Sequence, residues 1–179
     1  MIAAGYLYKK VKNRPDWLDA LHVKDIYSVS GCISENFVDY NNFWKHNGYW
    51  LFDSPGIMEE IAAENGIDLS GCKLFYYEVY ENEYDEVQGY WCPFKKEESF
   101  TTDVRIPETR ELKGYDIVSF SVHTSPECSP LSCNSLAKEI KVNEHCLLAT
   151  FKLAKSVLEH GKMQSCEPGP YRIFAVYET

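Results

Sequence analysis

The chain has 179 residues, of which 45% are hydrophobic and 25% are charged, so it is long and apolar enough to bury one core without disulfide or metal support. Its 18 basic and 27 acidic residues give a formal charge of −9, which argues against nucleic-acid binding and against attachment to an anionic membrane. No apolar run is long enough to span a bilayer, and the N-terminus lacks an export signal. The seven scattered cysteines then favour reduced thiols and a cytoplasmic location.

The first half of the chain is predicted to contain strands and one well-marked helix. Residues 2–11 and 23–33, which are rich in Val, Ile and Tyr, are expected to pair as a long-looped hairpin. A short helix is expected over residues 34–45. The segment 54–66 has a Ser-Pro start and a terminal glycine, which predict a second helix. The run 72–80 has the strongest strand composition in the chain.

The second half alternates in the same way. Residues 87–94 are expected to return as a hairpin partner, and residues 95–109 to form an exposed excursion. A short strand is predicted over 117–122. The longest helix is predicted over 143–161, because an asparagine suits its N-cap and a glycine its end. Residues 171–177 are expected to close the sheet.

This order of elements predicts a single α+β domain. Its sheet is expected to be mainly antiparallel, with a mixed sheet as the alternative, and to carry two principal helices on one face. Two pseudo-repeated β-α-β units, at about 48–90 and 114–178, are indicated by matches such as Gly48-Tyr49 with Gly114-Tyr115. Matches this short also arise by chance, so the predicted fold does not depend on them.

The stretch from residue 122 to residue 134 gathers the residue types that thiol or metal chemistry needs. A thiolate beside an imidazole makes a nucleophile, and Cys133 and Cys146 are both expected near helix starts, where a thiol pKa is lowered. The spacing also permits zinc, but no C-x-x-C pair and no His-x-Glu precedes it, so no cofactor is predicted and zinc is the alternative. Buried cysteines more often act as small hydrophobic residues. The candidate catalytic residues are Cys128, Cys133, His123, Cys146 and His145.

An acidic and aromatic run from residue 76 to residue 90 is the main candidate for binding. Alternate residues of a strand share one face, so its tyrosines and Glu78 are expected to form a row that attracts cations. The alternative is a solvated sheet face whose acids prevent edge-to-edge aggregation. An aromatic segment around Trp44 could line a pocket, but its large side chains are rather expected in the core, with residues 46–48 as a turn. An arginine after a rigid turn is expected to hold an anion or an ion pair, of which the ion pair is favoured. The candidate binding residues are Tyr76, Glu78, Tyr80, Tyr84, Trp44, His46 and Arg172.

The sequence therefore predicts a binding or interaction domain that recognises a small molecule or a protein through an aromatic and acidic surface. The alternative is a small cysteine- and histidine-dependent enzyme, with a thiol nucleophile or a zinc site, built around residues 123–134. The enzyme hypothesis requires a thiol and a histidine within hydrogen-bond reach in one cleft. The partner and the oligomeric state do not follow from the sequence.

Overall fold

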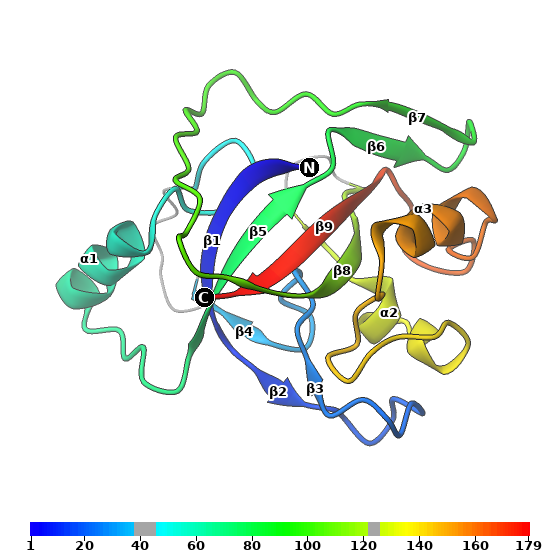
Figure 1. The fold of residues 1–179 in the computed structure, drawn as a ribbon, viewed down its shortest axis with the longest axis horizontal. Helices are drawn as coiled ribbons and strands as arrows, with labels where there is room; N and C mark the ends of the chain where they lie inside the picture. The colour runs from blue at the N-terminus through cyan, green and yellow to red at the C-terminus, as the bar shows by residue number, and fades with distance from the viewer. Residues whose placement is uncertain (38–45, 122–125) are drawn as a thin grey trace.

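The computed structural model describes residues 1–37, 46–121 and 126–179 (Figure 1). Within these residues a seven-stranded antiparallel sheet has the order β4-β1-β5-β9-β6-β7, and β8 also pairs with β9. Two helices of seven or more residues accompany the sheet, so the predicted α+β class is confirmed. No helix in the described part of the chain is both long and apolar enough to cross a membrane.

The sheet strands are β1 (Ile2–Lys10), β4 (Glu35–Asn36), β5 (Lys73–Val79), β6 (Asn82–Asp85), β7 (Tyr90–Pro93), β8 (Glu111–Ser119) and β9 (Tyr171–Glu178). The remaining elements are β2 (Lys12–Asn13), β3 (Asp25–Ile26), α1 (Pro55–Asn65), α2 (Pro130–Cys133), the 3₁₀ turn Leu136–Lys138 and α3 (Phe151–Glu159). Residues 94–110 form no helix or strand and pass round the sheet from β7 to β8 (Figure 1). The helices α1 and α3 lie at opposite ends of the sheet, with the central strands between them (Figure 1).

Two sequence predictions are wrong in detail. The predicted hairpin between residues 2–11 and 23–33 does not form, because β1 pairs with β4 and β5, while β3 pairs with β2. The predicted helix over 143–161 begins later, at Phe151, after Thr150, whose side chain accepts a hydrogen bond from the third residue along. Most of the helix expected over 34–45 lies outside the described residues, and its second and third residues are the strand β4.

The two halves of the chain build the same turn around an asparagine. Asn47 Oδ1 accepts hydrogen bonds from the backbone N–H groups two and four residues later, at 2.9 and 3.3 Å, and its amide donates to Ala4 O at 2.8 Å. Asn143 Oδ1 accepts from the N–H groups two and four residues later, at 3.0 Å each, and its amide donates to Lys113 O at 2.6 Å. Each asparagine side chain therefore links its turn by a hydrogen bond to a long strand earlier in the chain, which is β1 for Asn47 and β8 for Asn143.

A glycine in each opening strand makes room for this turn. Gly5 has a φ of +141° and Gly114 a φ of +149°. An added Cβ atom would lie 2.7 Å from Phe52 O at the first glycine and 2.7 Å from Leu147 Cβ at the second. Gly114 and its following tyrosine therefore stand in the same relation to the second asparagine turn as Gly5 and Tyr6 do to the first.

Each half contributes its helix to its own hydrophobic cluster. Met58 and Ile61 of α1 pack with residues of β1 and β5, and Ala154 and Leu158 of α3 pack with residues of β8 and β9. The equivalent strands β5 and β9 pair with each other at the centre of the sheet. The surface between the two helices is consequently formed by these central strands.

Candidate functional site

Three tyrosines and one glutamate from the central strands meet between the helices, and we call Tyr6, Tyr76, Glu78 and Tyr177 the tyrosine cage. Strand pairing places Tyr6 opposite Tyr76, and Tyr76 opposite Tyr177. The ring centroids of these two pairs lie 5.2 and 5.6 Å apart. Glu78 follows two residues after Tyr76 and accepts hydrogen bonds from the hydroxyl groups of Tyr177 (3.0 Å) and Tyr76 (3.5 Å). The carboxylate is therefore held beside the aromatic rings.

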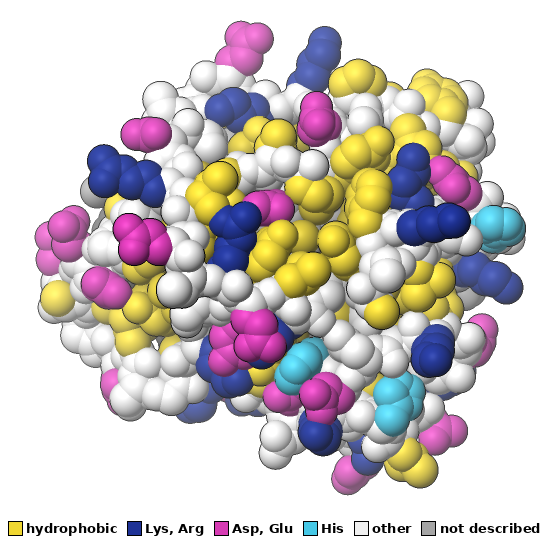
Figure 2. Space-filling view, in the orientation of Figure 1, with side chains coloured by type: hydrophobic (Ala, Val, Ile, Leu, Met, Phe, Trp, Pro, Cys, Tyr) yellow, Lys and Arg dark blue, Asp and Glu magenta, His cyan; other side chains and the backbone are white. Residues whose placement is uncertain are grey.

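The side chain of Arg110, at the end of the 94–110 segment, completes this arrangement. Its Nη2 atom lies 3.4 Å from Glu78 Oε1. Its Cζ atom lies 5.4 Å from the ring centroid of Tyr76 and 5.1 Å from that of Tyr177, within the range of cation–π attraction. Figure 2 shows hydrophobic side chains gathered over the central sheet, with basic and acidic side chains among them. The tyrosine cage thus already holds a guanidinium group from its own chain.

The electrostatics of the tyrosine cage favour neutral tyrosines and a cation. Burial, followed by the Glu78 carboxylate, raises the pKa of Tyr76, and the same causes together with the hydrogen bond to Glu78 raise the pKa of Tyr177 to about 12. Arg110 opposes the rise in the pKa of Tyr76. The hydroxyl groups of Tyr76 and Tyr177 therefore stay protonated and donate to Glu78, whereas that of Tyr6 donates to Arg105 O at 2.6 Å. The aromatic faces remain available to a positive charge.

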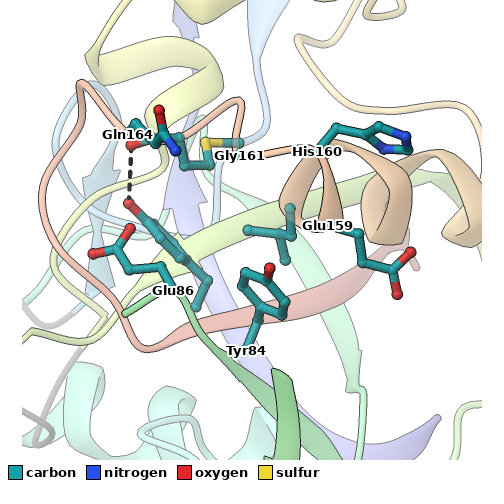
Figure 3. A pocket seen from close by; sticks show the side chains of 9 residues that line it. Tyr84, Glu86, Glu159, His160, Gly161 and Gln164 are labelled. Carbon is teal, nitrogen blue, oxygen red and sulfur yellow. Dashed lines mark hydrogen bonds between the residues drawn. The ribbon is translucent and has the colours of Figure 1, made fainter. Parts of the chain in front are cut away.

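A separate cavity of about 310 Å³ lies between β6 and the end of α3 (Figure 3). Tyr84 and Tyr171 line it, and Glu86 and Glu159 supply carboxylates. Both carboxylates already accept hydrogen bonds, Glu86 from a backbone N–H at 2.7 Å and Glu159 from the indole of Trp91 at 2.9 Å. This cavity is acidic and aromatic, but both of its carboxylates already have partners within the protein.

The predicted binding residues of β5 and β6 do not form one continuous row, because the later members pack beside α3. Tyr76 and Glu78 belong to the tyrosine cage, whereas Tyr80 packs on Phe151 at the start of α3, with ring centroids 4.9 Å apart. Tyr84 is buried in the cluster beside α3. The row therefore does not form one cation-binding surface: Tyr76 and Glu78 contact Arg110, and Tyr80 contacts Lys155, whose Nζ lies 5.6 Å from its ring centroid.

The other predicted binding residues lie apart from the tyrosine cage. The ring of His46 stacks on Trp50 with centroids 3.8 Å apart, and Trp44 is outside the described residues. Arg172 is buried, lies between the rings of Phe94 and Phe120, and donates from Nε to Glu83 at 3.0 Å. It forms an ion pair inside the protein, which is the second of the two roles predicted for it.

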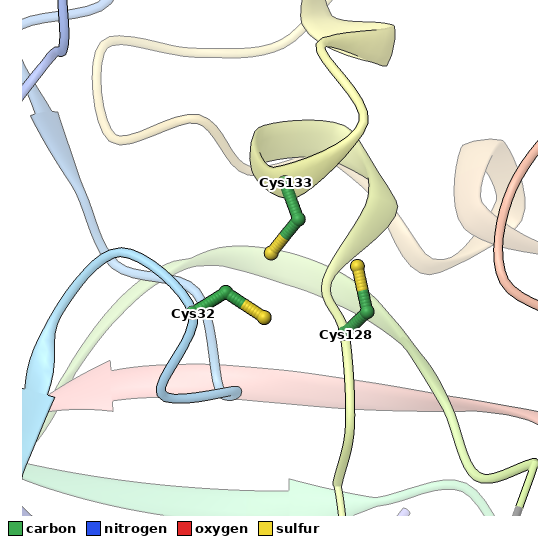
Figure 4. Close-up of side chains that lie close together, drawn as sticks. All are labelled: Cys32, Cys128 and Cys133. Carbon is green, nitrogen blue, oxygen red and sulfur yellow. The ribbon is translucent and has the colours of Figure 1, made fainter.

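The predicted catalytic thiols meet a cysteine that the sequence analysis did not select. Cys128 and Cys133 lie with Cys32 in a cluster whose three sulfur atoms are all within 4.8 Å of one another, and Figure 4 shows them pointing together. This is the one group of three or more potential metal ligands found among the described residues. His123, the predicted base, lies outside the residues that the structure describes.

The pair His145-Cys146 does not form a nucleophile and base. His145 Nδ1 lies 2.5 Å from Asp25 Oδ1, and its ring stacks on Tyr27 with centroids 4.1 Å apart. Cys146 is buried with a φ of +61°, and burial raises the pKa of its thiol. The expected helix start at Cys146 is wrong, because this residue lies in the turn organised by Asn143.

Four residues of these two sites were missed by sequence reasoning. Tyr6 and Tyr177 lie in predicted strands, where the period-two alternation of side chains could have indicated them. Arg110 and Cys32 carry no such signal, because their neighbours come from distant parts of the chain. Comparison with known proteins adds no further guide: no protein-family model, curated protein or solved structure shows significant similarity to this chain.

Proposed function

We propose that this protein is a binding domain for a small organic cation, which it takes up in the tyrosine cage in place of Arg110. The observation that carries this proposal is the guanidinium of Arg110 itself, which lies against two tyrosine rings and one carboxylate. A guanidinium or quaternary ammonium group on a free ligand has the same requirements. Because the seven cysteines are free, we propose a reducing compartment such as the cytoplasm for this activity.

The position of Arg110 favours its replacement. It ends a segment without helix or strand in which most residues from 101 to 110 are exposed, and its own side chain is 30% exposed. Segments with few buried contacts open at low free-energy cost. A ligand that competes with Arg110 binds only those molecules in which the segment is open. Its apparent affinity is therefore its affinity for the open form multiplied by the fraction of molecules that are open.

Arg172 provides a contrast within the same protein. Its guanidinium likewise lies against two aromatic rings and is paired with a carboxylate, but Arg172 belongs to the strand β9 and is 3% exposed. Removal of such a group leaves the partly buried carboxylate of Glu83 without its partner and leaves a gap between the two rings. Arg110 has both aromatic rings and a carboxylate beside its guanidinium, and it belongs to a segment outside the sheet and the helices.

The test is a titration of the purified protein with methylguanidinium and tetramethylammonium, followed by NMR chemical shifts. We expect Arg110→Ala to bind methylguanidinium at least about tenfold more tightly than the wild type, because the competing internal cation has gone. The double variant Arg110→Ala with Glu78→Gln is expected to lose this binding, since the carboxylate is neutralised. Arg105→Ala is the matched control, because it removes an exposed arginine from the same segment and leaves Arg110 in place.

The proposal fails if Arg110→Ala binds neither cation better than the wild type does. It also fails if the Glu78→Gln substitution leaves the binding unchanged. Arg110 would then be a structural clamp that fastens the 94–110 segment to the sheet, and Arg110→Ala would lower the free energy of unfolding without any gain in cation binding.

A further inference from the structure

The thiols of Cys32, Cys128 and Cys133 form a cluster that is independent of the tyrosine cage. Cys32 lies in the loop after β3, Cys128 bridges to Ser119 of β8, and Cys133 is the last residue of α2. Cys128 is buried, Cys133 is half-buried and Cys32 is exposed. The cluster therefore has a scaffold on one side and access to solvent on the other.

A buried polar network fixes the loop of Cys32 against the segment of the other two thiols. Asp116 Oδ2 accepts a hydrogen bond from Ser129 Oγ at 2.6 Å, and Ser129 Oγ accepts one from Ser30 N at 3.2 Å. The buried ammonium of Lys9 donates to Ser30 O at 3.3 Å. Networks of this kind are costly to leave incomplete, so they hold one arrangement. The three thiols are consequently preorganised by groups outside the cluster.

A thiol binds a metal ion as the thiolate, so binding at this cluster releases the thiol protons to water. The positive ion also offsets the repulsion that three neighbouring thiolates would otherwise have.

We propose that Cys32, Cys128 and Cys133 bind one Zn²⁺ ion as three thiolates, with the fourth position open to water on the solvent side. Sulfur atoms bonded to a tetrahedral zinc lie about 3.8 Å apart, so closing the present cluster takes shifts of about 1 Å or less. A divalent ion leaves a single net negative charge on the site, whereas copper(I) leaves two, and burial disfavours the larger charge. The Cys128 thiol donates to Asn134 Oδ1 at 3.2 Å, so Asn134 orients this side chain before its proton is released.

The test is a titration of the reduced, chelator-treated protein with Zn²⁺ against a coloured zinc chelator, with the stoichiometry read by native mass spectrometry. One ion per chain is expected, together with proton release in a weakly buffered solution. Cys32→Ser is the preferred variant because the residue is exposed, and we expect it to weaken zinc binding by about 100-fold or more. Cys133→Ser is expected to behave in the same way. Cys92→Ser removes a thiol outside the cluster and is expected to leave the affinity unchanged.

A second readout separates ligand loss from misfolding. Co²⁺ in the wild type is expected to give thiolate-to-metal absorption that weakens in each cluster variant while circular dichroism stays the same. Absence of zinc binding by the fully reduced wild type would overturn the proposal, and so would a Cys32→Ser variant that binds as tightly. If a disulfide forms within the cluster, it is reduced before the titration. The reduced protein then either binds zinc as proposed or gives one of the two contrary results.

Discussion

Tyr77 of β5 pairs directly with Val176 of β9, and these two residues occupy equivalent positions in the two halves of the chain. Tyr77 is the partner of Gly5 in the first half, and Val176 is the partner of Gly114 in the second. A pseudo-twofold axis therefore passes between them. The tyrosine cage lies beside this axis, so each half supplies part of it and neither half contains it alone.

The hydroxyl group of Tyr77 is buried without a hydrogen-bond partner among the described residues. Burial raises the pKa of this hydroxyl well above its usual value, so it remains neutral. Because an unsatisfied buried hydroxyl costs about 1–3 kcal/mol, we expect Tyr77→Phe to increase the free energy of unfolding by about 1 kcal/mol in urea titrations. Tyr27→Phe is the control: its hydroxyl accepts from Lys73 at 2.6 Å, and its removal is expected to lower the stability. A loss of stability in Tyr77→Phe would contradict this account.

The asparagine turns are expected to contribute similar stability in the two halves. Asn47→Ala and Asn143→Ala each remove hydrogen bonds to two backbone N–H groups and one carbonyl. We expect each variant to lose about 2–4 kcal/mol in urea unfolding, since several buried backbone groups lose their partners. Gln88→Ala, at an exposed position, is expected to change the stability by less than about 0.5 kcal/mol. If only one asparagine variant is destabilised, the two turns are not equivalent.

The Asn143 turn also explains where sequence reasoning failed. The side chain of an N-cap residue accepts hydrogen bonds from the backbone N–H groups just after it, and the side chain of Asn143 does the same. An acidic residue follows Asn143, as is common in the first turn of a helix. The chain then enters the left-handed region at Cys146, with a φ of +61°, and reverses instead of continuing as a helix. Local capping chemistry is the same in both cases, and hydrogen bonds of this segment with β8 and with residues 24–27 favour the turn.

Elements with their own local signals were predicted well. The Ser-Pro start and terminal Gly66 mark α1, and the aromatic and β-branched run marks β5. Period-two alternation likewise placed Tyr76 beside Glu78. The convergence of Arg110 on these residues, and of Cys32 on two distant thiols, depends on strand pairing across the whole chain. No spacing rule within the sequence contains that information.

Gly114 provides a test of the close approach between β8 and the Asn143 turn. An added Cβ atom would lie 2.7 Å from Leu147 Cβ and 2.8 Å from Leu148 O, at a φ that side chains rarely adopt. We expect Gly114→Ala to cost about 3 kcal/mol or more in thermal or urea unfolding, through overpacking and backbone strain together. Gly89→Ala isolates the backbone effect, because Gly89 has a φ of +72° and no atom within 4 Å of the added carbon, and we expect about 1 kcal/mol. Equal losses in the two variants would show that the turn yields to the extra atom.

Asp116 is expected to give the stability a distinctive pH dependence. Burial raises the pKa of this fully buried carboxyl from 3.8 to about 6, although hydrogen bonds from Ser129 and Val29 and the charge of Lys9 lower it. Between about pH 4 and pH 6 the folded state therefore holds a proton that the unfolded state has released, so this group's contribution to stability is present below pH 4 and is lost as the pH rises through 6.

Comparison with Asp116→Asn isolates that contribution from those of the other carboxyl groups. The asparagine does not titrate, so the stability of the wild type relative to the variant is expected to fall by on the order of 3 kcal/mol between pH 4 and pH 7. Urea unfolding of both proteins at intervals across this range measures the difference. A difference that stays constant, or that grows with pH, would show that Asp116 is ionised in the folded protein throughout, with Lys9 and the hydrogen-bond donors outweighing its burial.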